Sequence, residues 1–147
     1  MEYLKAKRED LDQIYQLVQE TIQTIYPQYY PESIVDFFCN LHSKENIAAD
    51  IENSYVRVLA LDNLLIGTGT FSENHISRLF VLPNFQKKGY GSHIMQCLEE
   101  EISAKHHFAM LDASLCATCF YEHKGYKTIS HKELSTDTGF SLVYGIM

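Results

Sequence analysis

The stretch of sequence that decides the fold is Gln86-Lys87-Lys88-Gly89-Tyr90-Gly91-Ser92. It follows an apolar run at residues 76–82 that is typical of a buried strand, and it opens an amphipathic segment at residues 92–105 that is typical of a helix. The N–H groups of a first helical turn lack partners and carry partial positive charge, and the two lysines add full charges. The two glycines allow positive φ and a close approach of a ligand. The stretch predicts an anion-binding turn, with an ordinary solvated turn as the alternative.

The spacing of the glycines excludes the two commonest phosphate-binding loops. A Walker loop has the pattern G-x-x-x-x-G-K-[ST], whereas both lysines of this turn precede its glycines. A dinucleotide fingerprint needs a third glycine three residues after the second, but Gly91 is followed by Ser92, His93 and Ile94. A phosphate at this turn therefore belongs to neither of these loop classes.

Two segments together resemble the signatures of the GNAT family of N-acetyltransferases. The first is Arg78-Leu79-Phe80-Val81-Leu82-Pro83-Asn84-Phe85-Gln86-Lys87-Lys88-Gly89-Tyr90-Gly91, which is similar to an apolar strand with V-x-P and then [QR]-x-x-G-x-[GA]. The second is Leu111-Asp112-Ala113-Ser114, followed by Phe120-Tyr121-Glu122-His123-Lys124-Gly125-Tyr126, which is similar to a strand and a helix carrying F-Y-x-x-x-G-[FY]. The resemblance is specific over residues 76–126. It implies an α/β (α+β) chain with the GNAT fold: a mixed, mostly antiparallel central sheet of about six to seven strands with helices on both faces.

The resemblance also implies an enzyme, an N-acetyltransferase that uses acetyl-CoA as co-substrate and passes the acetyl group directly to a primary amine. Backbone groups of Leu79, Phe80 and Val81 would pair with the pantetheine arm, and the Val81 N–H would polarise the thioester carbonyl. The backbone of residues 86–92 would hold the pyrophosphate. An acyl-CoA-binding regulatory module without turnover is the alternative function, because the glutamate that many family members use as a base is replaced by His75.

Candidate catalytic residues follow from the same resemblance. Tyr121 occupies the position of the tyrosine that protonates the leaving thiolate, and a phenol with a pKa of about 10 suits that role. His75 is a candidate base. Glu73 is a second one, on the same strand face if the strand extends that far. Ser114 and Phe120 would lie beside the coenzyme, although a serine at this place is also a good helix N-cap. For Tyr121 and His75, a half-buried helix tyrosine and a solvent-facing strand residue are the structural alternatives.

Aromatic residues crowd the segment that family members use to shape the acceptor pocket. Tyr26, Tyr29 and Tyr30 are the candidate substrate-binding residues, with Phe37 and Phe38 close behind them. An aromatic wall can hold an apolar or a cationic acceptor, in the second case by cation–π contact. For each residue alone, core packing is the alternative. The expected acceptor is a small-molecule or peptide amine.

Composition sets the outer bounds. The chain has 147 residues, 46% of them hydrophobic, and a net charge of −7. This length suits one core, so a single domain over residues 1–147 is expected. No apolar run approaches the ~20 residues that cross a bilayer, and residues 1–5 lack the apolar stretch of a secretory signal, which predicts a cytoplasmic protein without a membrane partner. The negative charge argues against a nucleic-acid partner.

The segment Cys116-Ala117-Thr118-Cys119 supports one more alternative, a dithiol redox protein, because a helix N-terminus can lower a thiol pKa. Thioredoxin-like proteins carry this motif early in the chain and a cis-proline later, whereas the prolines here are Pro27, Pro31 and Pro83. Zinc would need a second pair of ligands, and the two histidines at positions 106 and 107 are adjacent rather than four apart, so no metal is expected. The cysteines are interpreted as packing residues.

Apolar periodicity and turn residues predict the elements. Helices are expected from residue 10 to the proline at 27, from residue 31 to about 41, and at residues 46–52, 92–105 and 117–124; strands are expected at residues 3–7, 54–61, 64–71, 75–82, 108–114, 127–134 and 140–146. Hairpin turns are expected at Asp62-Asn63 and at Asp137-Thr138-Gly139. The continuous apolar character of residues 108–114 predicts burial on both faces. The closing strands could pair between two subunits as edge strands do, which would give a homodimer.

Overall fold

The computed structural model describes residues 1–114, 116–135 and 141–146. Its strands are β1 (Glu2–Lys5), β2 (Val56–Leu61), β3 (Leu64–Ser72), β4 (His75–Val81), β5 (Met110–Ala113), β6 (Ser130–Ser135) and β7 (Ser141–Ile146). Its α-helices are α1 (Leu11–Ile25), α2 (Glu32–Leu41), α3 (Lys44–Glu52), α4 (Tyr90–Ser103) and α5 (Thr118–His123). The elements expected from the sequence are all present within this part of the chain, with ends shifted by a few residues. The turn expected at Asp137-Thr138-Gly139 lies outside the described residues.

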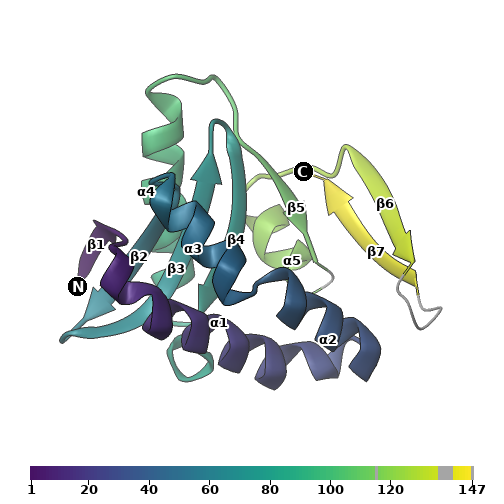
Figure 1. Cartoon of the computed structure of the whole chain (residues 1–147). Coiled ribbons are helices and arrows are strands. Elements are labelled where there is room, and N and C mark those ends of the chain that lie inside the picture. Colours follow the sequence, from purple (N-terminus) through teal and green to yellow (C-terminus); the bar gives the residue numbers. More distant parts are fainter. Residues whose placement is uncertain (115, 136–140, 147) are drawn as a thin grey trace.

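The strands form one mixed sheet in the order β1-β2-β3-β4-β5-β7-β6. The β4–β5 pair is parallel, and the other neighbours pair antiparallel. Helices cover both faces, with α1, α2 and α3 on one and α4 and α5 on the other (Figure 1). The expected fold class is therefore confirmed. β1 and β6 are the edge strands of this sheet. Pairing of the closing strands between two subunits stays a prediction.

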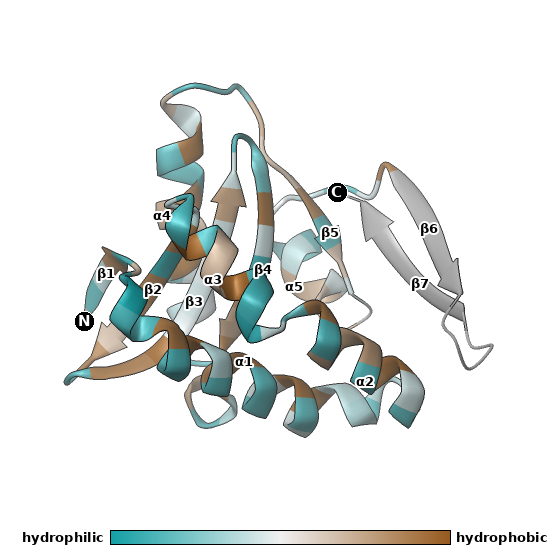
Figure 2. Cartoon of the chain, viewed as in Figure 1, coloured by the Kyte–Doolittle hydropathy of each residue, from teal (hydrophilic) through white to brown (hydrophobic). Residues whose placement is uncertain are grey.

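The helices on the first face form where their apolar stripes predict them. α1 buries Ile14, Leu17, Val18 and Ile22, and a 3-10 turn at Tyr26–Gln28 follows it because a proline occupies position 27. α2 begins directly after the proline at 31, and α3 is capped by the Ser43 side chain, which accepts from the Asn46 N–H. Brown and teal residues alternate around α1 and α2, as amphipathic helices require (Figure 2).

Two tight hairpins join β2, β3 and β4. Asp62 and Asn63 both take positive φ, as a two-residue hairpin turn requires, so the turn expected there is confirmed. The second turn falls at Glu73, which has a φ of 55° and lies between β3 and β4. Glu73 would share a strand face with His75 only if the strand extended that far; β4 begins at His75 and the chain reverses at Glu73, so that condition is not met.

The second face of the sheet is built for close packing. Gly67 and Gly69 of β3 face α4, and a Cβ on either would come within 2.7 Å or 2.8 Å of an Ile94 or Leu98 side chain. Glycine at these two positions lets α4 approach the sheet directly. On this face α4 buries its expected apolar residues, Ile94, Met95, Leu98 and Ile102. The axis and the start of α4 are thereby fixed relative to β4.

The strand β5 differs from its expected burial. Leu111 and Ala113 are buried, but Asp112 between them is exposed, and Phe108 before the strand is 64% exposed. Burial on both faces is therefore wrong for this strand. The reason is tertiary: Leu111 and Ala113 pack into the core on the α4 side, while Asp112 on the opposite face lines a cavity.

Candidate functional site

The site begins where β4 and β5 separate. Among the described residues the two strands pair only at His75↔Met110 and Ile76↔Leu111, while β5 pairs with β7 along its other edge. In Figure 1 the two strands run side by side at one end and diverge toward the other. The C-terminal half of β4 consequently presents backbone groups to an open edge inside the molecule, where an extended ligand can add like a strand.

A β-bulge shapes the same part of β4. Thr68 pairs with Phe80 and Thr70 with Ser77, so two residues of β4 stand opposite the single residue between the two threonines. One of the two, Arg78, has a φ of 49°, in the left-handed region that a long side chain rarely adopts. Such a conformation costs about 1–2 kcal/mol and persists only where the surroundings hold it. The bulge turns the Arg78 side chain toward α2 and α3.

At the end of β4, the backbone N–H and C=O groups of successive residues point to opposite sides of the strand. The Leu82 N–H donates to the Ile66 carbonyl at 2.8 Å, and alternation along an antiparallel pair then directs the N–H and the C=O of Val81 away from β3. The Val81 carbonyl accepts from the Gln86 side-chain amide at 2.9 Å. The Val81 N–H is left facing the open edge, which is the orientation that the expected role of this group requires.

The turn after β4 has the left-handed residues of an anion-binding loop. Lys87 has a φ of 62° and Gly89 a φ of 90°, and α4 begins at Tyr90. No side chain caps this helix, and its first intrahelical bond runs from the His93 N–H to the Gly89 carbonyl. The N–H groups before His93 therefore point into the turn. Of the two glycines, Gly89 uses the positive φ that glycine allows, whereas Gly91 lies within α4.

Two other residues of the turn have structural roles. The Gln86 N–H donates to the Pro83 carbonyl at 3.3 Å, and its side chain holds the Val81 carbonyl, so Gln86 positions the strand end. The Lys88 ammonium lies over the Phe85 ring, 5.7 Å from its centroid.

Gly91 faces α5 across the start of α4. A Cβ on this residue would meet the Phe120 ring at 3.5 Å and the Val81 side chain at 3.8 Å. These are ordinary contact distances, so the position has room for a methyl group. They also show that Phe120 lies beside the turn, between α5 and the first residues of α4.

The open edge leads into a cavity of about 340 Å³. Its walls come from both strands, from the 3-10 turn after α1, from α2 and from the α5 region, and their residues are mostly apolar and aromatic: Tyr26, Phe37, Phe38, Leu41, His42, Ile76, Ser77, Arg78, Leu79, Phe80, Asp112, Ala113, Ser114, Ala117 and Tyr121. The cavity brings together residues of both signature segments and of the aromatic segment, but no residue of the turn 86–92 lines it.

Tyr121 projects from α5 into this cavity. The residue is only 7% exposed, and burial raises the pKa of its phenol above the ordinary value. The group is therefore protonated at neutral pH and can act as a hydrogen-bond and proton donor. The chain directly after this short helix is tied to α4, because the Tyr126 hydroxyl donates to a carboxylate oxygen of Glu99 at 2.9 Å.

Of the three candidate acceptor tyrosines, only Tyr26 lines the cavity. Its ring packs edge-on against Phe38 with centroids 4.8 Å apart, and burial raises the pKa of its phenol, an effect that a hydrogen bond with the Ser114 side chain opposes. Tyr30 is a buried core residue behind it, and Tyr29 is 53% exposed outside the cavity.

Ser114 does not cap α5, contrary to the alternative expected for it. The N-cap is Ala117, which makes no side-chain cap bond. The Ser114 carbonyl instead accepts from the Ala117 N–H at 3.1 Å and from the Thr118 hydroxyl at 3.0 Å. Its hydroxyl does not bond to α5 and instead hydrogen-bonds with Tyr26 and with the thiol of Cys116.

The candidate base His75 lies at the rim rather than in the cavity. Its Nε2 is 3.8 Å from a carboxylate oxygen of Asp112, and both side chains are about half exposed. Asp112 itself lines the cavity, on the face of β5 opposite Leu111. The sequence reasoning missed Asp112, although its position inside the second signature was a usable signal.

A second polar group was also missed. Arg78 donates from Nε to Nδ1 of His42 at 3.1 Å and from Nη1 to Asp50 at 2.7 Å. The Arg78 side chain is 7% exposed. Burial and the nearby guanidinium lower the pKa of His42 to about 3. No pattern in the sequence links these three residues.

The surroundings of Cys116 favour the protonated, unreactive form of its thiol. Burial raises its pKa to about 11, only partly offset by the hydrogen bond from Ser114. A redox or nucleophilic cysteine needs a lowered pKa. Among the described side chains, no three or more His, Cys, Asp or Glu residues converge as metal ligands. In the same part of the chain, no helix is long and apolar enough to cross a membrane.

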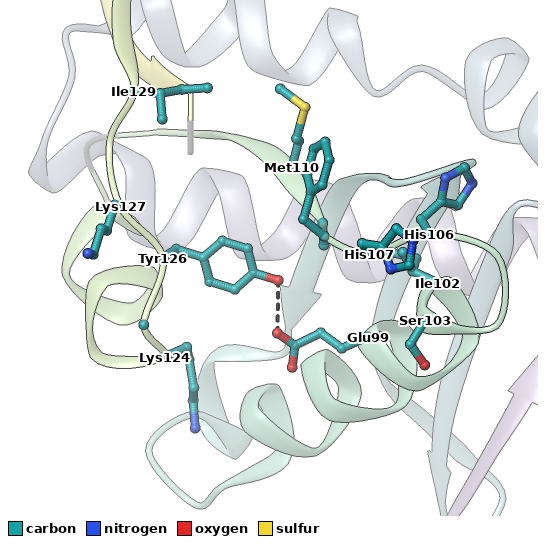
Figure 3. Close-up of a pocket in the computed structure, with 13 residues that line it drawn as sticks. Glu99, Ile102, Ser103, His106, His107, Met110, Lys124, Tyr126, Lys127 and Ile129 are labelled. Carbon is teal, nitrogen blue, oxygen red and sulfur yellow. Dashed lines mark hydrogen bonds between the residues drawn. The ribbon is translucent and has the colours of Figure 1, made fainter.

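A larger cavity of about 630 Å³ lies elsewhere, between the ends of α4 and α5 (Figure 3). Tyr126 and Glu99 meet in it, with His106, His107 and Met110 around them. It shares no lining residue with the cavity between β4 and β5. The candidate proton donor Tyr121 lines the smaller cavity, whereas the last residues of the second signature, Lys124, Gly125 and Tyr126, line the larger one.

Comparisons with known proteins agree with this geometry. Residues 25–143 match the family described as acetyltransferase (GNAT) domain. The fold is similar to that of a GCN5-related N-acetyltransferase from Rhodopseudomonas palustris, with a TM-score of 0.91 and 19% identity over 99% of this chain and 92% of the other. It is similar to the PaiA N-acetyltransferase from Thermoplasma acidophilum in complex with coenzyme A, with a TM-score of 0.70 and 20% identity over 98% and 96%. It is also similar to the ribosomal-protein-S18-alanine N-acetyltransferase from Escherichia coli, with a TM-score of 0.72 and 16% identity over 99% and 90%. The comparison with curated proteins gives no match.

Proposed function

The chain belongs to the GNAT acetyltransferase family, and on this premise we propose that it is a single-domain N-acetyltransferase that moves the acetyl group of acetyl-CoA to a primary amine. The observation that carries the proposal is the separation of β4 from β5, which opens a polar backbone edge beside an uncapped helix start. Transfer would be direct, within a complex of both substrates. Cytoplasmic location stays a prediction.

Binding of the coenzyme rests on the main chain. The Val81 N–H faces the open edge and suits the thioester carbonyl, where a fixed donor stabilises developing negative charge. The N–H groups of residues 87–92 and the two lysines suit the pyrophosphate, because a helix start attracts anions. The free side of Phe120, next to Gly91, would bound the coenzyme at the same place. The residues present therefore fit the group.

Proton transfer would involve two places in the cavity. Tyr121 is the proposed donor to the leaving thiolate, because burial keeps its phenol protonated until the thiolate forms. Asp112 is the proposed acceptor of the proton from the incoming ammonium, directly or through a water. His75 stands next to Asp112 on the solvent side, which suits a relay of that proton to the solvent.

The alternative, a coenzyme-binding module without turnover, predicts the same binding and no transfer. A redox function is disfavoured by the raised pKa of Cys116. The first experiment is therefore thermal unfolding with increasing acetyl-CoA and with adenosine as control. Ligand at 100 times its Kd should add about 2.7 kcal/mol of stability. No shift with millimolar acetyl-CoA would refute the proposal.

The second experiment separates enzyme from module. Coenzyme A release is measured with a panel of primary amines for the wild type and for Tyr121→Phe. The expected result is turnover in the wild type and a lower kcat in the variant, with the stabilisation by acetyl-CoA kept. Binding without any turnover would support the regulatory module. Unchanged turnover in Tyr121→Phe would remove Tyr121 from the mechanism.

A further inference from the structure

His42 is held rigidly in the wall of the cavity. It follows α2, where its N–H donates to the Phe38 carbonyl at 3.2 Å and its carbonyl accepts from the Gln19 side chain at 3.1 Å. Its ring packs edge-on against Phe80, with centroids 5.4 Å apart. The ring is thus fixed by the backbone, by Phe80 and by Arg78 at the bulge of β4.

The contact with Arg78 decides which ring nitrogen carries the proton. A guanidinium can only donate, so Nδ1 of His42 must accept, and the proton of the neutral ring sits on Nε2. The lowered pKa of His42 means that the ring is neutral at physiological pH. Nε2–H is therefore a fixed donor rather than a base.

His42 lines the cavity, and its Nε2 has accessible surface. Nδ1 makes the one side-chain hydrogen bond that the ring has within the described part of the chain. Within that part, the fully buried side-chain polar atoms without a partner belong to Ser33 and Thr70, so Nε2 of His42 is not sealed in the protein. A ligand oxygen in the cavity can reach it.

The wall around this donor has no net charge. Asp50 balances Arg78 through the bond at 2.7 Å, and His42 is neutral. Such a wall suits a neutral carbonyl oxygen better than a carboxylate. On β5, across the cavity from α2, Asp112 offers negative charge to an ammonium group, and the aromatic residues around Tyr26 offer an apolar surface.

We propose that His42 selects the acceptor by donating from Nε2 to a carbonyl oxygen next to the reacting amine. The acceptor class is then an α-amino amide with an apolar side chain, the chemistry found at the N-terminus of a peptide. This inference rests on the proposed acetyl transfer. It adds a specificity-determining residue on α2 and a substrate class to it.

The test compares two acceptors that differ by one carboxamide, leucinamide and isoamylamine. The kcat/KM ratio of the two is measured for the wild type, His42→Ala and His42→Phe, where Phe keeps the ring packing on Phe80 and lacks the donor. Because each variant is compared with the wild type, the different basicities of the amines cancel. The ratio should fall about tenfold in both variants, the effect of losing one hydrogen bond. His42→Gln, which keeps an N–H donor, should restore much of it.

The exposed residue His107 provides the matched control, because it lies in the other cavity, and His107→Ala should leave the ratio unchanged. If His42→Ala and His42→Phe turn over both amines with the wild-type kcat/KM ratio, the role of His42 is refuted, while the proposed acetyl transfer still stands. Stabilisation by acetyl-CoA without turnover of any amine in the wild type would overturn the proposed acetyl transfer, and this inference with it. Stabilisation by acetyl-CoA in each variant checks that the fold and the coenzyme site are intact.

Discussion

Mild acid should destabilise this protein through His42. The folded state holds its pKa at about 3, because burial and Arg78 both oppose a positive charge there. In the unfolded chain the pKa returns to about 6.5, so the unfolded state binds the proton first. The stability that His42 contributes is present above that unfolded value and is lost as the pH falls toward the folded one. Each pH unit within this window costs about 1.4 kcal/mol, so the loss between pH 7 and pH 5 should be about 2 kcal/mol.

The assay is urea unfolding at pH 7 and at pH 5, followed by circular dichroism because the chain contains no tryptophan. His42→Gln can accept from Arg78 and does not titrate, so it should lose about 2 kcal/mol less than the wild type over the same pH change. His107→Gln, at an exposed histidine, should behave as the wild type. Equal losses in the wild type and in His42→Gln would show that His42 is not held neutral, and the assignment of its Nε2 proton would fall with that result.

Three further variants test the site and its scaffold. Gly91→Ala should stabilise the ligand-free protein by up to about 1 kcal/mol, because alanine is the better helix former, yet weaken acetyl-CoA binding by placing a methyl group toward Phe120; tighter binding would contradict the placement of the coenzyme. Gly69→Ala should cost about 1–3 kcal/mol in chemical denaturation, because its Cβ would come within 2.8 Å of Leu98; an unchanged midpoint would show that α4 can shift. Cys116→Ala should leave kcat/KM unchanged, and loss of turnover with the fold intact would revive the thiol as a functional group.

Much of the fold was predictable because its signals are local. The stripe of α1, the prolines at its end and before α2, and the left-handed pair at Asp62-Asn63 act through neighbouring residues. The start of α4 was predicted within two residues, at Tyr90 instead of Ser92. The left-handed conformations of the turn fall at Lys87 and Gly89, and the sequence did not single out Lys87 for that conformation.

The candidate site was predictable only in part. The resemblance named Val81 and Tyr121; Tyr121 lines the cavity, and the polar backbone groups of Val81 point away from β3. It named His75 as the candidate base, whereas Asp112 is the carboxylate among the residues that line the cavity. Which of two polar side chains reaches a cavity depends on where neighbouring strands stop pairing, and the ladder between β4 and β5 ends at Leu111, one residue before Asp112.

By itself, the sequence determined the order and the type of the elements and the family. These features depend on residue preferences and spacings within a few turns of chain. Tertiary structure alone decided where β4 and β5 separate and how Arg78 meets its partners. His42 and Asp50 lie 36 and 28 residues from Arg78, on two different segments. Their contact exists because α2 and α3 pack across a bulged strand, and only the packing of the whole chain can bring such distant groups together.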